Sequence, residues 1–198
     1  MRREAEQYRS ALLVSTYAVK ELFRTLQGEG ANTGRVAVFC RFAGCNLWSG
    51  LESGRASGTG GCSAWCDTEF VGTDGQGGGK FASADQLADA AWATWAHKAD
   101  EPGTPLVVCT GGEPLLPLDS ELTDALHRRG FDVAIETNGT LPVPAGVDWV
   151  CVSPKAGSTL VVNEGHELKL VVPQAGIDPA EYLALDFQHY FIQALDGP

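Results

Sequence analysis

Short apolar segments alternate with polar and glycine-rich stretches along most of the chain. Residues 36–42 (VAVFCRF) are apolar almost throughout, as expected for a strand that is buried on both faces. A strand-like segment begins at Tyr17, and five later apolar runs are also typical of strands. These runs cover residues 105–109, 131–135, 147–152, 166–172 and 189–192.

Helical patterns separate several of these strands. In residues 83–97 apolar side chains recur at helical spacing after Ser83, a suitable N-cap. A second helix is expected over residues 119–129, ended by Gly130, and a short one near 179–185. Strands that alternate with helices predict parallel βαβ units. We therefore expect an α/β fold with about six mostly parallel strands, either an open doubly wound sheet or a partial barrel.

The length of the chain fits one principal domain. Its 198 residues are enough for a substantial core and too few for two comfortable ones. Residues 1–15 show no recognisable chemistry and are expected to form an N-terminal extension, with a core domain over 16–198.

Polar and glycine-rich groups follow five of the predicted strands directly. Parallel strands end at one rim of their sheet, and α/β proteins place their chemistry there. The sequence therefore predicts one site, formed by segments from five strand ends. They are GCNLW (44–48), TGGEP (110–114), ETNGT (136–140), SPK (153–155) and QALDG (193–197).

Charge and hydrophobicity exclude several classes of function. The net charge is −11, from 25 acidic and 14 basic residues, and there is no block of Lys or Arg, so direct nucleic-acid binding is not expected. No apolar run approaches the roughly 18 residues of a membrane span, and no secretory signal is visible. We expect a cytoplasmic protein, in which cysteines stay reduced.

The six cysteines divide into two groups. Cys40, Cys109 and Cys151 lie within apolar strands and are expected in the core. The other three, Cys45, Cys62 and Cys66, lie in a glycine-rich loop, where soft thiolates suit an iron–sulfur cluster or zinc. A zinc-stabilised binding module would need a fourth ligand at short spacing, and none is visible. A four-iron cluster with three protein thiolates would keep one iron open.

Several separate motifs together resemble the 7-carboxy-7-deazaguanine synthases, which are radical S-adenosylmethionine (SAM) enzymes of queuosine and 7-deazapurine biosynthesis. The motifs are LQGEG (26–30), CRFAGCNLWSG (40–50), CDTEFVGTDG (66–75), CTGGEP (109–114), IETNG (135–139), VSPK (152–155) and the closing DGP. The resemblance implies a partial (β/α) barrel of the radical SAM type. It also implies a carbon–nitrogen lyase that converts 6-carboxy-5,6,7,8-tetrahydropterin to 7-carboxy-7-deazaguanine with loss of ammonia. A homodimer and an electron donor such as flavodoxin or ferredoxin are further implications.

The resemblance also assigns roles to individual residues. Cys45, Cys62 and Cys66 would bind a 4Fe-4S cluster, and Glu113 would join them in catalysis. Thr68 would meet a Mg²⁺ ion, which prefers oxygen ligands. The residues implied for SAM are Gly111, Gly112, Glu113, Ser153, Pro154, Lys155, Gln193, Ala194, Leu195 and Asp196. Those implied for the pterin are Leu26, Gln27, Gly28, Glu29, Arg41, Thr110, Glu136 and Asn138.

Two features depart from the family pattern. Sixteen residues separate Cys45 from Cys62, and three separate Cys62 from Cys66, where the family normally has two. Our hypothesis is that a local bulge absorbs the extra residue and that the cluster still forms. Family members continue past DGP, so the C-terminal cap is expected to be missing or truncated. An alternative, a radical SAM activase acting on a protein partner, would lack the LQGEG and CDT elements.

Overall fold

The computed structural model describes residues 16–95 and 103–195. The predicted extension over residues 1–15, the end of the helix predicted over 83–97, and Asp196 therefore lie outside the described residues.

One sheet of eight strands organises the described part of the chain. Its spatial order is β3-β1-β2-β4-β5-β6-β7-β8. Each neighbouring pair from β2 to β8 is parallel, whereas β1 is antiparallel to both β2 and β3. The strands are β1 (Tyr17–Leu26), β2 (Val36–Phe42), β3 (Gly79–Phe81), β4 (Leu106–Gly111), β5 (Asp132–Thr137), β6 (Trp149–Val152), β7 (Glu164–Val172) and β8 (Asp186–Ala194).

The predicted α/β architecture with six mostly parallel strands is confirmed, and the sheet is a partial barrel that does not close. The six parallel strands are those expected, and β1 and β3 add two antiparallel strands on one side. The prediction did not include β3 as a definite strand because its three residues lie in a glycine-rich stretch with little apolar pattern.

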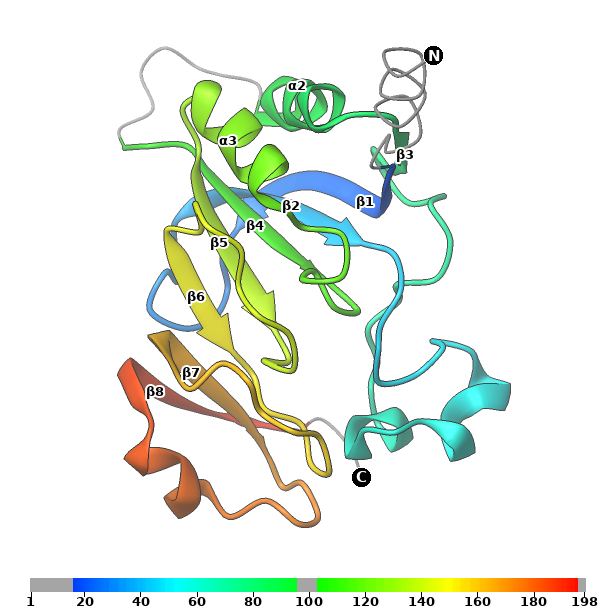
Figure 1. The fold of residues 1–198 in the computed structure, drawn as a ribbon, viewed down its shortest axis with the longest axis vertical. Coiled ribbons are helices and arrows are strands. Elements are labelled where there is room, and N and C mark those ends of the chain that lie inside the picture. The colour runs from blue at the N-terminus through cyan, green and yellow to red at the C-terminus, as the bar shows by residue number, and fades with distance from the viewer. Residues whose placement is uncertain (1–15, 96–102, 196–198) are drawn as a thin grey trace, which may run out of the picture.

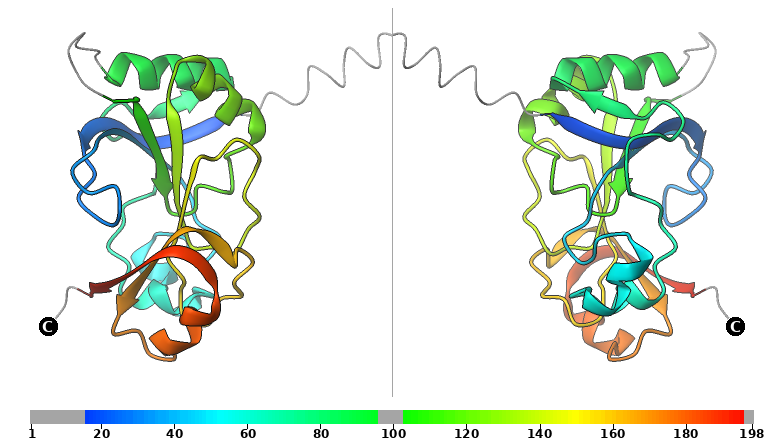
Figure 2. Two further views of the ribbon diagram at one scale, coloured as in Figure 1. Left: turned by 90° about the vertical axis from the view of Figure 1, so that its left-hand side faces the viewer. Right: turned by 90° about the vertical axis from the view of Figure 1, so that its right-hand side faces the viewer.

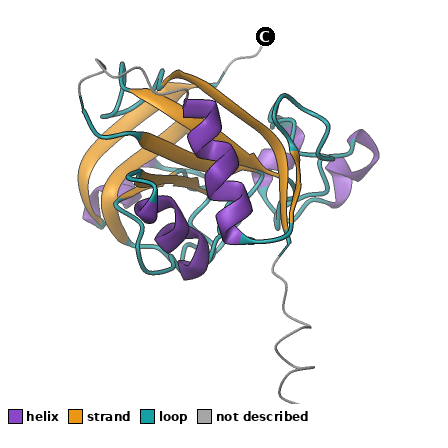
Figure 3. Ribbon diagram, turned by 90° about the horizontal axis from the view of Figure 1, so that it is seen from above, coloured by secondary structure: helices purple, strands orange, loops and turns teal. Residues whose placement is uncertain are grey.

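Two α-helices cover the outer face of the sheet at its β1–β5 end. They are α2 (Ala84–Trp95) and α3 (Ser120–Arg128), which lie together above these strands (Figures 1 and 3). The predicted N-cap at Ser83 is present, because Ser83 Oγ accepts from the Gln86 N–H. Asp119 caps α3 in the same way, with Oδ1 accepting from the Leu122 N–H, which the sequence analysis did not predict. The helix predicted near 179–185 is instead a 3₁₀ helix, η3 (Pro179–Ala184).

Alternation along the strands separates an apolar outer face from a partly polar inner one. On β2, β4 and β5, Cys40, Cys109 and Ile135 belong to the core cluster that packs against α2 and α3. Their neighbours Arg41, Thr110 and Glu136 carry polar side chains on the other face. Cys151 is also buried, so all three cysteines predicted in strands are buried as expected.

The remaining strand connections contain little helix. No α-helix separates β5 from β6 or β6 from β7 in the described chain. The strands β7 and β8 lie at the end of the molecule opposite α2 and α3 (Figure 2). The loop after β2 carries two 3₁₀ helices, η1 (Glu52–Ser57) and η2 (Gly61–Ala64). This loop lies on the side toward which the arrows of β4, β5 and β6 point (Figure 1).

Candidate active site

A cavity at the carboxyl ends of the parallel strands joins most of the predicted site segments. Its volume is about 160 Å³. It is lined by all three loop cysteines, by Thr68, and by residues from the ends of β4, β5, β6 and β7. The lining residues are Cys45, Leu47, Trp48, Cys62, Cys66, Thr68, Phe70, Thr110, Gly111, Gly112, Glu136, Thr137, Asn138, Ser153, Lys155 and Lys169.

The turn between Cys62 and Cys66 accommodates the extra residue that sets it apart from the usual spacing. The N–H of Cys66 donates to the carbonyl oxygen of Cys62 (2.7 Å), as does that of Trp65 (3.0 Å). The segment is therefore a helical turn, not the bulge that the sequence suggested. Residues four apart on a helical turn lie on the same face, so the geometry directs both thiols to one side.

The turn of Gly111 and Gly112 packs directly against the segment that carries Cys45. A Cβ at Gly112 would lie 2.2 Å from the carbonyl oxygen of Gly44 and 2.7 Å from Cβ of Cys45. Gly111 has a φ of +140°, which favours glycine. The N–H of Glu113 donates to Gly44 (3.0 Å). Only glycines allow the two backbones to approach this closely.

The Glu113 carboxylate is fully buried and bonded within the protein. Its Oε1 accepts from Thr137 Oγ1 (2.7 Å) and the Leu115 N–H (2.9 Å), and its Oε2 accepts from the Asn138 N–H (2.8 Å). Burial raises the pKa of Glu113, although these hydrogen bonds oppose the shift. The side chain does not line the cavity. This geometry supports a positioning role that joins the GGEP turn to β5, and the predicted catalytic role stays a prediction.

Ser153 and Lys155 line the same cavity as the two glycines. Lys155 Nζ donates to Ser153 Oγ (2.6 Å) and to the Ser153 carbonyl oxygen (2.7 Å). Burial lowers the pKa of Lys155, while the nearby Cys62 and Cys66 oppose the shift. Burial raises the pKa of Cys62 to about 11, partly offset by Lys155. The free thiol is thus protonated at neutral pH, and metal binding would release its proton.

Lys169 links the polar side chains predicted to meet the pterin. Its Nζ lies 2.7 Å from Glu29 Oε2 and 3.4 Å from Glu136 Oε1. Glu136 Oε1 also accepts from Gln27 Nε2 (3.0 Å), and its Oε2 accepts from Thr110 Oγ1 (3.3 Å). The structure therefore brings four predicted substrate residues, from three separate segments, into one network around a lysine.

Asn138 also lines this cavity, and two side chains hold it in place. Its Nδ2 donates to Asn46 Oδ1 (3.0 Å), and its Oδ1 accepts from Thr140 Oγ1 (2.6 Å). Asn46 follows Cys45 directly, so this contact joins the cysteine loop to the end of β5.

Several predicted site residues lie outside this cavity lining. Leu26 is 59% exposed at the end of β1, and Arg41 Nε donates to Glu21 Oε1 (2.7 Å). Gln193, predicted for SAM, donates from Nε2 to Glu29 Oε1 (2.7 Å), on the side of the pterin residues. The others are Gln27, Gly28, Glu29, Glu113, Pro154, Ala194 and Leu195.

Sequence reasoning did not select Lys169 for the site, and it included Asn46 and Trp48 only as members of the segment 44–48. Lys169 gave the clearest signal, because it interrupts the apolar run of residues 166–172. Its partners lie far from it in sequence and come close only through the sheet. Trp48 packs edge-to-face on Phe70, with ring centroids 5.7 Å apart.

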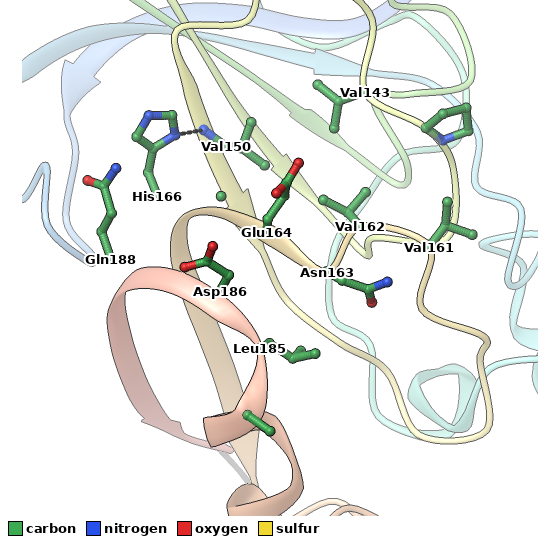
Figure 4. A pocket seen from close by; sticks show the side chains of 13 residues that line it. Val143, Val150, Val161, Val162, Asn163, Glu164, His166, Leu185, Asp186 and Gln188 are labelled. Carbon is green, nitrogen blue, oxygen red and sulfur yellow. Dashed lines mark hydrogen bonds between the residues drawn. The ribbon is translucent and has the colours of Figure 1, made fainter.

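A second and wider hollow lies away from the thiols, around the beginnings of β7 and β8 (Figure 4). Its volume is about 1020 Å³. Val150, Val162 and Leu185 line it, together with Glu164 and Asp186. No cysteine lines it, so the predicted chemistry belongs to the smaller cavity.

The three thiols that line the smaller cavity are of the ligand type that an iron–sulfur cluster requires. No group of three or more His, Cys, Asp or Glu side chains in the described residues is arranged to hold one metal ion. Trp48 Nε1 is buried and has no acceptor among the described residues, so it could donate to a bound group.

Comparisons with known proteins agree with the fold and identify the family. No family model matches the chain. It is 63% identical to the 7-carboxy-7-deazaguanine synthase of Bordetella pertussis, over 92% of this chain and 84% of the relative. It is 57% identical to that of Caulobacter vibrioides, with the same coverage of both chains. The crystal structure of QueE from Escherichia coli superposes with a TM-score of 0.65 at 29% identity, covering 91% of this chain and 85% of that one.

The fold and site thus define a radical SAM enzyme built on a partial (β/α) barrel. More particularly, the chain belongs to the 7-carboxy-7-deazaguanine synthase family, a family of lyases. Across the described residues, none of the helices combines the length and the apolar character that crossing a bilayer requires.

Proposed function

We propose that this chain converts 6-carboxy-5,6,7,8-tetrahydropterin to 7-carboxy-7-deazaguanine with loss of ammonia, in queuosine and 7-deazapurine biosynthesis. The observation that carries the proposal is a single cavity lined by three thiols and by polar side chains suited to a pterin. The name shared by the relatives supports the same reaction. No specific observation favours a protein-activating enzyme or a zinc module.

The three cysteines would hold a 4Fe-4S cluster, and the residues beside them would hold SAM. When bound, these groups supply the one-electron chemistry that removes a hydrogen atom from the substrate. Gly111 and Gly112 would leave backbone atoms accessible to SAM, and Ser153 and Lys155 line the same cavity. The remaining predicted contacts, from Pro154 and from residues 193–196, belong to the same proposal.

The polar network would bind and orient the pterin. Glu136 and Asn138 would accept from and donate to the amide and amino edge of its ring, beside Thr110. Burial raises the pKa of Glu29, but the Lys169 ammonium outweighs that effect, so its pKa is lowered and it stays a carboxylate. Arg41 would pair with the substrate carboxylate, as guanidinium geometry favours. Thr68, which lines the cavity, would contribute one oxygen to a Mg²⁺ ion.

Partners and location form the last part of the proposal. A homodimer is supported by the edge strand β8, where Ile192 is 68% exposed and Tyr190 is 40% exposed. The one-electron chemistry calls for a donor such as flavodoxin or ferredoxin. A cytoplasmic location would keep the cluster thiols reduced.

Anaerobic reconstitution followed by a product assay tests the proposal. The protein is incubated with dithionite, SAM and the tetrahydropterin, and products are identified by mass spectrometry. We expect 7-carboxy-7-deazaguanine from the wild type and at least a ten-fold lower kcat/KM for Glu136→Gln, about 1.4 kcal/mol in binding of the transition state. Glu121→Gln, an exposed position on α3, is the matched control and should be unaffected.

The other outcomes distinguish between parts of the proposal. If 5′-deoxyadenosine forms without the deazaguanine, the radical chemistry stands and the substrate is wrong. If neither compound forms on protein with a full iron complement, the proposed function is wrong.

A further inference from the structure

Arg55 lies within the sixteen residues that separate Cys45 from Cys62, and its side chain folds back onto the turn of the other two cysteines. Its Nη1 donates to the carbonyl oxygens of Ser63 (2.8 Å) and Cys66 (3.3 Å). Its Nη2 donates to Cys66 as well (3.4 Å). The carbonyl oxygens at the end of a helical turn have no hydrogen-bond donors within the turn, and the Arg55 guanidinium donates to them instead.

The same guanidinium also contacts the segment that follows Cys45. Its central carbon lies 4.8 Å from the centroid of the Trp48 ring, a cation–π contact. One side chain therefore touches Trp48, close to the first cysteine, and the residues that carry or follow the other two.

Two further contacts fix the position of Arg55. Glu52 accepts from its Nε through both carboxylate oxygens (2.7 and 2.8 Å). The Ser63 hydroxyl donates back to the Arg55 carbonyl oxygen (3.0 Å), so the bond between these two residues is reciprocal. Arg55 is only 30% exposed in its side chain. A planar guanidinium can satisfy several acceptors and stack on an indole at the same time, whereas the lysine ammonium is a point charge.

We propose that Arg55 is a positioning residue that holds the Cys62–Cys66 turn at the distance from Cys45 that a cluster requires. The inference rests on the proposed function, because it assumes that these three thiols bind a cluster. It explains how a long insertion between the first two cysteines remains compatible with one site. The insertion itself contains the residue that fixes the position of the Cys62–Cys66 turn.

The test compares Arg55→Gln with Arg55→Lys and with a matched control, Arg35→Gln. Arg35 is 41% exposed in its side chain and pairs with Asp132, away from the loop. Each variant is reconstituted anaerobically, and iron and sulfide per chain, the electron paramagnetic resonance spectrum of the reduced protein and the rate of iron loss to a chelator are measured. Circular dichroism confirms that each variant is folded.

We expect the wild type and Arg35→Gln to hold about four irons per chain, the content of one cluster. Arg55→Gln should retain less than half of this iron and lose it at least five-fold faster, with an altered resonance spectrum. Arg55→Lys should recover only part of the lost iron content, because an ammonium group lacks the planar set of N–H donors of a guanidinium.

The possible failures are distinguishable. A wild type that binds one iron or fewer contradicts the proposed function. A wild type with a full cluster, together with Arg55→Gln matching it within two-fold in iron content and loss rate, overturns the role of Arg55. If Arg55→Lys has the iron content and the rate of iron loss of the wild type, a planar guanidinium is not required at this position. If Arg55→Gln does not fold, Glu52→Gln replaces it, and a rate of iron loss equal to that of the wild type overturns the inference.

Discussion

Replacing Lys169 with Met tests whether the buried network holds the site together. Lys169 is 7% exposed, and its ammonium lies 2.7 Å from Glu29 and 3.4 Å from Glu136. Met keeps most of the aliphatic side chain and removes the charge. The two carboxylates would then lose their common cation, and the repulsion between them would no longer be offset.

The size of the effect follows from how buried the partners are. Breaking a fully buried pair costs roughly 3–5 kcal/mol. The side chains of Glu29 and Glu136 are 46% and 24% exposed, so water screens part of the charge that remains. We therefore expect a loss of about 2–3 kcal/mol, roughly a 4–12 °C decrease in Tm for a chain of this length.

Anaerobic urea unfolding, followed by tryptophan fluorescence, measures this loss. Lys80→Met, at an exposed position on β3, is the control and should stay within about 0.5 kcal/mol of the wild type. The double variant Lys169→Met/Glu136→Gln should regain about 1 kcal/mol, because it removes one of the unpaired charges. A loss from Lys169→Met no larger than that of the control, or strict additivity in the double variant, would refute the reasoning.

Three further predictions concern the same site. Gly112→Ala should lose at least half of the reconstituted iron, because its Cβ would lie 2.2 Å from the Gly44 carbonyl oxygen, whereas Gly79→Ala, with no contact nearer than 3.8 Å, should bind iron normally. Glu113→Ala should destabilise the fold by about 3 kcal/mol in urea unfolding, since three buried donors lose their acceptor; a change below 1 kcal/mol would contradict this. Burial lowers the pKa of Lys169, but the nearby carboxylates outweigh burial and raise it overall. The charged lysine therefore stabilises the fold fully below its pKa in the unfolded chain, and this stabilisation is lost as pH rises through the higher pKa of the folded protein. The stability difference between wild type and Lys169→Met should therefore stay constant from about pH 7 to 9 and decrease above about pH 10; a decrease already at neutral pH would contradict this.

Much of the architecture could be read from local pattern. The apolar runs after Gly34 could be predicted as strands because short, continuously apolar segments rich in β-branched residues are typical of parallel strands that are buried on both faces. The cap at Ser83 depends on one hydrogen bond between residues three apart, so it too is visible in sequence. The parallel direction of β4 and β5 follows from the helix between them, whereas no α-helix in the described chain separates β5 from β6 or β6 from β7.

Spacing alone did not show how the unusual cysteine turn folds. Three intervening residues are compatible with a bulge or with a helical turn, and the choice depends on the Cys66–Cys62 hydrogen bond and on the acceptors that Arg55 satisfies. The family resemblance likewise implied Glu113 as a candidate for direct chemistry, and in the fold three donors from the end of β5 and its own turn surround its carboxylate.

The sequence by itself therefore determined most of the strands, the cap at Ser83, the polar segments at the strand ends and the three loop thiols, because each depends on residues close together in the chain. The tertiary structure alone decided the partners of Lys169, since Glu29 and Glu136 lie 140 and 33 residues away from it. It also decided the contacts of Arg55, whose partners lie within eleven residues of it but in a loop that has no periodic pattern. The partners of Lys169 depend on how separate segments pack across the sheet, and such packing has no periodic signature in the chain.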